Sequence, residues 1–89
     1  MSYYHYMDNF LLLTRLGVEI RQLRKHRGLS QAALAQLAGV TRQKLIEIEQ
    51  GSDSVGAGHY ARVIAALGSE LHIVPARMPT LEELKGIFP

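Results

Sequence analysis

The sequence predicts an all-α fold: a compact bundle of four to five helices, followed by one short β-strand near the C-terminus. Apolar residues recur at the three- and four-residue spacings of a helical face over most of residues 10–69. Glycines and N-capping residues separate these periodic segments. After them, the run ELHIVP is rich in residues that favour strands and is too short for another helix. A chain of 89 residues is expected to form one domain.

The first helix is expected to begin soon after Asp8 or Asn9, which are both good N-cap residues. The aromatic and polar residues 1–9 are interpreted as an N-terminal arm. The helix has one apolar stripe at helical spacing, formed by Leu12, Leu13, Leu16, Ile20 and Leu23. Gly28 is predicted to end it, because glycine readily adopts the left-handed conformation that follows many helices.

Two short helices separated by a glycine are predicted next. Ser30 is the expected N-cap of the first of them, and Gly39 ends it. Thr41 is the expected N-cap of the other, which stops at Gly51. The buried sides are assigned to Leu34, Ala35, Leu37 and Ala38 in the first and to Leu45 and Ile48 in the second.

The loop SDSVGAG, rich in glycine and serine, leads to a fourth helix predicted from Gly58 to Leu67. Its buried face is assigned to Tyr60, Val63, Ile64 and Leu67. The strand follows at residues 70–76. Residues 77–89 form a C-terminal tail, in which a T-x-x-E capping box predicts a short fifth helix.

Composition excludes several kinds of site. The chain has no cysteine, so neither a disulfide nor a cysteine zinc site can form. Its four histidines are scattered without ligand spacing, and no metal and no cofactor are expected. The apolar run FLLL is far too short to cross a bilayer, and the N-terminus lacks the basic region of a secretory signal. A cytoplasmic protein that does not contact a membrane is therefore predicted.

An enzyme is not expected. The run VGAGHY contains G-x-G, but it lacks the third glycine and the preceding strand of a dinucleotide site. Asp53, Ser54 and His59 are the residue types of a catalytic triad. They lie close together in and just after one loop, however, and nothing in the sequence fixes their geometry.

Basic residues are concentrated in the first half of the chain. Between residues 15 and 44 they are Arg15, Arg21, Arg24, Lys25, Arg27, Arg42 and Lys44, with Glu19 as the only acid. From residue 46 onward the acids outnumber the bases. The net charge is only +2, but this distribution suits a protein that turns one face toward a polyanion. An ordinary solvated helix face is the alternative interpretation.

The segment Ser30–Gly51 has the features of a helix-turn-helix unit, with a first helix, a short turn containing glycine, and a second helix. In such a unit the second helix lies in the major groove of DNA, with its N-terminal residues toward the base edges. Arg42 can bridge O6 and N7 of guanine, and Gln43 can bridge N6 and N7 of adenine. The alternative is that these residues form an ordinary polar helix face.

Four further residues of this unit are assigned contacts with DNA. Lys44 and Thr41 are placed for phosphate or mixed contacts. Gln31, at the start of the first helix of the unit, could hold a phosphate through its amide and nearby backbone N–H groups. Glu47 could accept a hydrogen bond from N4 of cytosine, or it could repel phosphate and so restrict binding.

The chain resembles the Xre, or Cro/CI-type, helix-turn-helix regulators over IRQLRKHRGLSQAALAQLAGVTRQKLIEIEQG and, further on, YARVIAALG, about two-thirds of its length. The resemblance implies a lambda-repressor-like bundle of four or five helices that binds operator DNA as a dimer. By motif position, the residues that fall where this family touches DNA are Gln31, Thr41, Arg42, Gln43 and Glu47. Many members have an acid at or near the position of Lys44. The resemblance also implies a partly buried structural ion pair between Arg24 and Glu49.

The strand at 70–76 needs a partner for its backbone groups. The same strand of a second copy, related by a twofold axis, would supply it and create a homodimer. The pairing residues are assigned as Leu71, His72, Ile73 and Val74.

A bundle followed by such a strand resembles the HipB-like antitoxins, a branch of the Xre family. This resemblance implies a HipA-like kinase toxin as a partner, and repression of the operon that encodes both. Three alternatives are open: a solitary Xre-type regulator, a protein-interaction module that keeps the fold without binding DNA, and a coil in place of the strand.

Overall fold

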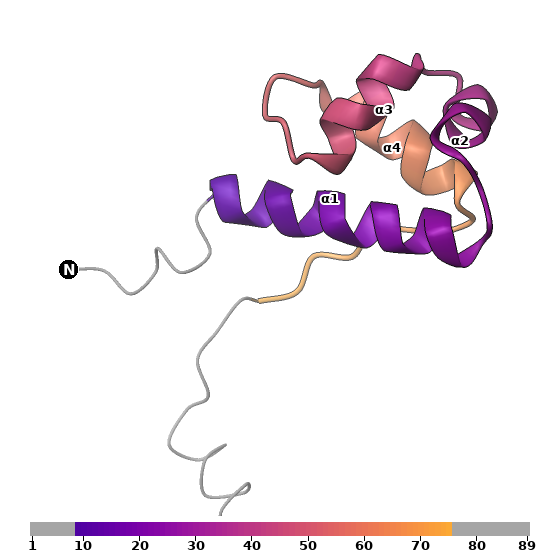
Figure 1. Ribbon diagram of the computed structural model, residues 1–89. Helices are drawn as coiled ribbons and strands as arrows, with labels where there is room; N and C mark the ends of the chain where they lie inside the picture. Colours follow the sequence, from indigo (N-terminus) through magenta and orange to yellow (C-terminus); the bar gives the residue numbers. More distant parts are fainter. Residues whose placement is uncertain (1–8, 76–89) are drawn as a thin grey trace, which may run out of the picture.

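The structure describes residues 9–75, and this part of the chain contains four helices. In this computed structural model they are α1 (Asn9–His26), α2 (Gln31–Ala38), α3 (Arg42–Glu49) and α4 (Ala57–Ala66). The long helix α1 forms one layer, and the three short helices lie together over one side of it (Figure 1). The all-α class predicted from the sequence is confirmed.

The core lies where the three short helices meet one another and α1. Helix α2 packs against both α3 and α4, and α1 packs against α3. The buried apolar residues are Ile20, Leu34, Ala35, Ala38, Leu45, Ile48, Val55, Tyr60, Val63, Ile64 and Leu67. Burial of a large aliphatic side chain contributes about 1.5–3 kcal/mol, so this cluster is the main source of stability for the described region.

Two leucines of the predicted apolar faces are exposed. The assignment of Leu37 to a buried side was wrong. Leu37 is 64% exposed, because the buried arc of α2 runs through Leu34, Ala35 and Ala38 and leaves Leu37 beyond its edge. Leu12 is 52% exposed. It shares the side of α1 that carries the apolar stripe, but it lies near the end of α1 that extends past the other helices (Figure 1).

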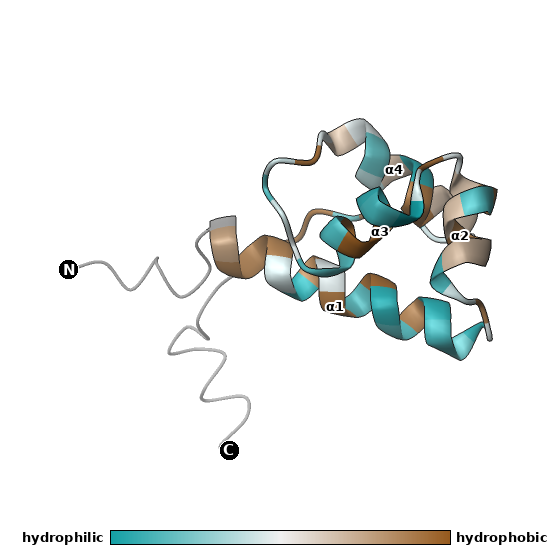
Figure 2. Ribbon diagram, turned by 45° about the horizontal axis from the view of Figure 1, so that its top comes forward, coloured by the Kyte–Doolittle hydropathy of each residue, from teal (hydrophilic) through white to brown (hydrophobic). Residues whose placement is uncertain are grey.

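Figure 2 shows the apolar character of this end of α1, which is brown, whereas the end nearer α2 is largely teal. The fourth helix is displaced by one residue from its predicted bounds, because Gly56 serves as its N-cap and Leu67 as its C-cap. Within residues 9–75, no helix combines the length and apolar character needed to cross a bilayer.

Helices α1 and α3 touch backbone to backbone at two glycines. A Cβ atom on Gly17 would lie 2.6 Å from the carbonyl oxygen of Glu49, which is closer than real Cβ contacts allow. A Cβ atom on Gly51 would lie 2.7 Å from Cα of Thr14, and Gly51 also has a φ of 78°. Both positions therefore require glycine, and the contact holds the end of α3 against the middle of α1.

Residues 70–75 follow the bundle as an exposed segment that is neither helix nor strand within the single chain. In Figure 1 this segment passes behind α1 and emerges below it. The predicted strand is therefore not formed within the described residues, because a strand exists only when its backbone groups have a partner. Residue 76, the arm up to residue 8, and the tail 77–89 with its predicted fifth helix lie outside the described residues.

Candidate nucleic-acid interface

The turn between α2 and α3 is held by backbone and side-chain hydrogen bonds. Gly39 adopts the left-handed conformation, with φ 72° and ψ 32°, and its N–H bonds to the last turn of α2. The N–H of Val40 donates to the carbonyl of Ala35 at 3.0 Å, and the side chain of Val40 packs against the core. The hydroxyl of Thr41 accepts a hydrogen bond from the N–H of Lys44 at 3.0 Å. The first turn of α3 is thus fixed relative to α2.

The residues assigned to DNA contacts lie around the start of α3. Arg42 and Gln43 are exposed in its first turn, next to the exposed Thr41, whereas Lys44 and Glu47 are half-buried. Nε2 of Gln43 lies 3.4 Å from Oε2 of Glu47, one turn later on the same helix. Helix α3 shows both teal and brown in Figure 2, because this polar surface shares a short helix with a buried apolar side.

The structure also brings Gln31 to this surface from the start of α2. Its Oε1 accepts a hydrogen bond from Nη2 of Arg42 at 3.3 Å, and its Nε2 donates to Oε1 of Glu49 at 3.2 Å. Gln31 is half-buried. The sequence predicted an amide open to a phosphate, and it contained no signal that both polar ends of this side chain would have protein partners.

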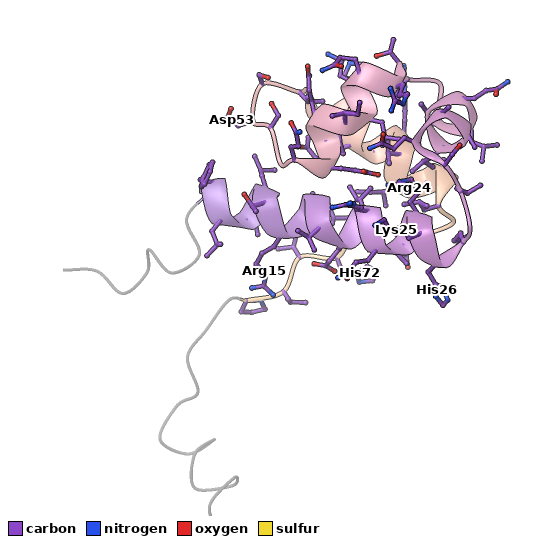
Figure 3. The ribbon with its side chains drawn as sticks, in the orientation of Figure 1. Arg15, Arg24, Lys25, His26, Asp53 and His72 are labelled. Carbon is purple, nitrogen blue, oxygen red and sulfur yellow. The ribbon has the colours of Figure 1, made fainter. Side chains whose placement is uncertain are left out.

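Behind Gln31 lies a buried ion pair. Nε of Arg24 is 2.6 Å from Oε2 of Glu49, and Nη2 of Arg24 is 3.3 Å from Oε1. Nη1 of Arg24 donates to the carbonyl of Leu29 at 2.9 Å. Arg24 and Glu49 are only 7% and 9% exposed. In Figure 3, Arg24 lies on the side of α1 that faces the other helices, whereas Arg15 and His26 lie on the opposite side.

The amino-acid sequence of this region matches a known protein family. Residues 15–72 match the family described as helix-turn-helix domain. The chain belongs to this helix-turn-helix family. The resemblance stated from the sequence is thereby confirmed at the level of a helix-turn-helix regulator.

Two relatives of this helix-turn-helix chain are themselves uncharacterised HTH-type transcriptional regulators. One, y4aM of Sinorhizobium fredii, is 44% identical over 57 residues, which are 64% of this chain and 38% of that protein. The other, from Methanothermobacter thermautotrophicus, is 45% identical over 51 residues, which are 57% of this chain and 74% of that protein. The chain thus spans well under half of the first relative and most of the second.

Beside the ion pair, the helix-turn-helix unit has a polar pocket that the sequence did not indicate. Its volume is about 250 Å³, and it is lined by Arg21, Gln31, Ile46, Glu49 and Gln50. Arg21 and Gln50 are exposed. Arg21 was named from the sequence only as one of the basic residues, and neither residue was assigned to a site. A weak signal existed, because Arg21 precedes Arg24 by three residues on one helix and Gln50 directly follows Glu49. These two side chains bring hydrogen-bond donors to the pocket, which the carboxylate of Glu49 also lines.

Tyr60 fixes the loop that follows the helix-turn-helix unit. Its hydroxyl donates to the carbonyl oxygen of Ser52 at 2.7 Å, and the residue is buried in the core. Burial raises the pKa of Tyr60, and the negative charge of Asp53, on the same loop in Figure 3, raises it further. The phenol therefore stays protonated and continues to donate. Within residues 9–75, no three histidine, aspartate or glutamate side chains gather as a metal site would require.

Proposed function

We propose that the chain is a transcriptional repressor that binds double-stranded DNA in a sequence-specific manner and acts as a homodimer. Membership of the helix-turn-helix family makes DNA-binding regulation of transcription its class of function. The observation that supports the proposal best is the exposed pair Arg42 and Gln43 in the first turn of α3, directly after the Thr41 cap. These residues occupy the part of a second helix that meets base edges in such units.

The proposed contacts divide into two groups. Arg42 bridges a guanine and Gln43 an adenine, because their paired hydrogen-bonding groups match those base edges. Thr41 and Lys44 lie beside them at the start of α3, where contacts with phosphates would set the position of α3 in the groove. Glu47 limits the choice of base, either by accepting from cytosine or by repelling phosphate.

The homodimer is proposed to form through residues 70–76. Within the described part of this segment, Leu71, Ile73 and Val74 are exposed, Ile73 to 97%. Exposed apolar side chains on an extended segment favour pairing with a second copy, which would supply both backbone partners and apolar contacts. A twofold dimer would also place two copies of α3 about one DNA turn apart.

A more specific form of the proposal is a HipB-like antitoxin that represses its own operon and binds a HipA-like kinase toxin. The exposed segment that follows the bundle supports this form, and the tail 77–89 is the proposed toxin-facing part. No catalytic role and no cofactor are proposed. Access to operator DNA implies a cytoplasmic location.

The test is a selection of bound fragments from a random duplex pool by the purified chain at near-physiological salt. We expect an inverted repeat to be enriched, whose spacing gives the distance between the two copies of α3. Binding to the selected duplex should weaken steeply as salt rises, because phosphate contacts release counterions. Failure to enrich any sequence, with a flat salt response, would instead favour a protein-interaction module that retained the fold.

A further inference from the structure

Four side chains form a continuous path of hydrogen bonds from α1 to the first residue of α3. Arg24 bonds both carboxylate oxygens of Glu49, at 2.6 and 3.3 Å. Gln31 donates to Oε1 of Glu49 at 3.2 Å, and Arg42 donates to Oε1 of Gln31 at 3.3 Å. Gln31 therefore links a buried ion pair to the exposed guanidinium at the start of α3.

Donor and acceptor chemistry allows only one orientation of the Gln31 amide on this path. The ionised carboxylate of Glu49 can only accept hydrogen bonds, so Gln31 must turn its NH₂ group toward it. The guanidinium of Arg42 can only donate, so it must meet the amide oxygen. A flipped amide would place an oxygen against the carboxylate and an NH₂ group against the guanidinium. Since two bonds from Arg24 hold Glu49 in place, the orientation of Gln31 is set from the core.

We propose that Glu49 and Gln31 are positioning residues, which fix the guanidinium of Arg42 for recognition of one base pair. This inference rests on the proposed DNA-binding function. The guanidinium has five N–H donors, so the bond to Gln31 leaves a pair of donors free to bridge O6 and N7 of a guanine. A side chain that is already oriented loses less conformational freedom when it binds. The buried ion pair thus serves base preference as well as stability.

This role differs in its consequences from the phosphate contact that the sequence suggested for Gln31. Loss of a phosphate contact weakens binding by a similar factor on every duplex. Loss of a positioning residue weakens the preference at one base pair, namely the one that Arg42 contacts. The two roles can therefore be separated by measuring base preference rather than affinity alone.

The experiment begins with the duplex selected by the parent chain, and with duplexes that each differ from it by one base pair. Dissociation constants are measured for every duplex at one fixed salt concentration. Arg42→Ala identifies the base pair that Arg42 contacts, where preference should fall by roughly tenfold. Gln31→Met should lower the preference at that same base pair by about fivefold, since one hydrogen bond to Arg42 is lost. Gln36→Met, an exposed position on the same helix, is the matched control and should leave every preference unchanged.

Glu49→Gln tests the buried end of the path. The new amide at position 49 will turn its oxygen toward the charged Arg24, so its NH₂ group will face Gln31. The amide of Gln31 must then turn its oxygen toward position 49 and its NH₂ group toward Arg42. Preference at the Arg42 base pair should fall, with no additional loss when the change is combined with Arg42→Ala. Val63→Ala removes buried volume in α4 without touching the path, so it controls for lost stability and should leave the preference unchanged. Circular dichroism at the assay temperature verifies that each variant is folded.

Equal weakening of binding on all duplexes by Gln31→Met would overturn the proposal and leave Gln31 as a phosphate contact. The Gln31→Met result does not depend on whether Glu49→Gln folds. Unchanged preference in a folded Glu49→Gln variant would overturn the role of Glu49. A parent chain that enriches no sequence would overturn the proposed function itself, before any variant is compared.

Discussion

The charges of Arg24 and Glu49 are both buried, so each depends on the other. Their direct bond of 2.6 Å is supported by the carbonyl of Leu29 on one side and by Gln31 on the other. Taking two charges out of water is costly, and their attraction offsets this cost only when the geometry is good and the remaining polar atoms are bonded. The pair therefore matters most when one member is missing, because the other charge is then buried without compensation.

Single substitutions of this pair should be severe. We expect Arg24→Met or Glu49→Leu to lower the free energy of unfolding by about 3–5 kcal/mol, because each leaves one buried charge unpaired. The double variant should recover part of this loss, since both charges are then removed. Urea unfolding followed by circular dichroism measures all three. Single variants that unfold at the same urea concentration as the parent would contradict the burial of the pair.

Tyr60 links stability to alkaline pH. Tyr60→Phe should cost about 1 kcal/mol near neutral pH, because the hydrogen bond to the Ser52 carbonyl is lost. The raised pKa means that the folded state holds the phenolic proton more tightly than the unfolded state does. The resulting gain in the free energy of unfolding is fully present below pH 10.0, the ordinary pKa of tyrosine. It is lost as the pH rises through the higher pKa of Tyr60 in the folded state. Urea unfolding from pH 9 to 11 should therefore show a smaller alkaline loss in Tyr60→Phe than in the parent; equal losses would argue against the prediction.

At the scale of the elements, the contact between α1 and α3 determines the position of the interface. Helix α3 reaches α1 closely enough that a side chain at Gly17 would collide with backbone atoms of Ile48 and Glu49. Backbone atoms cannot move aside as a flexible side chain can, so the two helices would have to separate. The same contact places Glu49, the last residue of α3, beside Arg24 of α1. It thereby fixes how the start of α3 lies relative to α2.

Two glycine-to-alanine changes in helices should have opposite effects. Gly17→Ala should destabilise the fold by about 1–3 kcal/mol, because the added methyl group overpacks the α1–α3 contact. The methyl group added by Gly58→Ala, in the first turn of α4, meets no atom within 4 Å, so this change should stabilise the fold by about 0.4–1 kcal/mol. Thermal unfolding of both variants beside the parent provides the comparison. A stabilised Gly17→Ala variant would show that α1 and α3 are not in close contact in solution.

At the scale of the whole molecule, the described chain leaves apolar residues uncovered after the bundle. Leu71, Ile73 and Val74 are exposed on a segment that forms no strand pairing with the other described residues. Pairing with the same segment of a second copy is the proposed solution, and such pairing would join two copies of α3 in one dimer suited to an inverted repeat.

If the chain forms the proposed dimer, Ile73→Pro should convert it to a monomer while the helical bundle stays folded. Proline has no N–H to donate to the partner strand and disrupts pairing. Sedimentation analysis measures the oligomeric state, and circular dichroism measures the helical content. Ile73→Val keeps the N–H group and the branched shape, so it is the matched control and should remain dimeric. Survival of the dimer in Ile73→Pro would exclude pairing through this segment.

The local features of this protein could be predicted from its amino-acid sequence. The caps Ser30 and Thr41, and the left-handed glycine at Gly39, lie where the pattern predicted them. Each depends on interactions between residues at most four or five apart, and such interactions are set by residue type. The helix-turn-helix class followed from the same local signals.

Which side chains meet across the fold became known only from the packing of the helices. Periodicity placed Leu37 on a buried face, but the arc that α2 buries is set by where α3 and α4 pack. Gly17 carried no signal in the sequence, because its role depends on a helix that lies about thirty residues further along. The bonds of Gln31 to Glu49 and Arg42 join residues 18 and 11 positions away. Contacts over such separations depend on how the helices pack, and no local pattern specifies them.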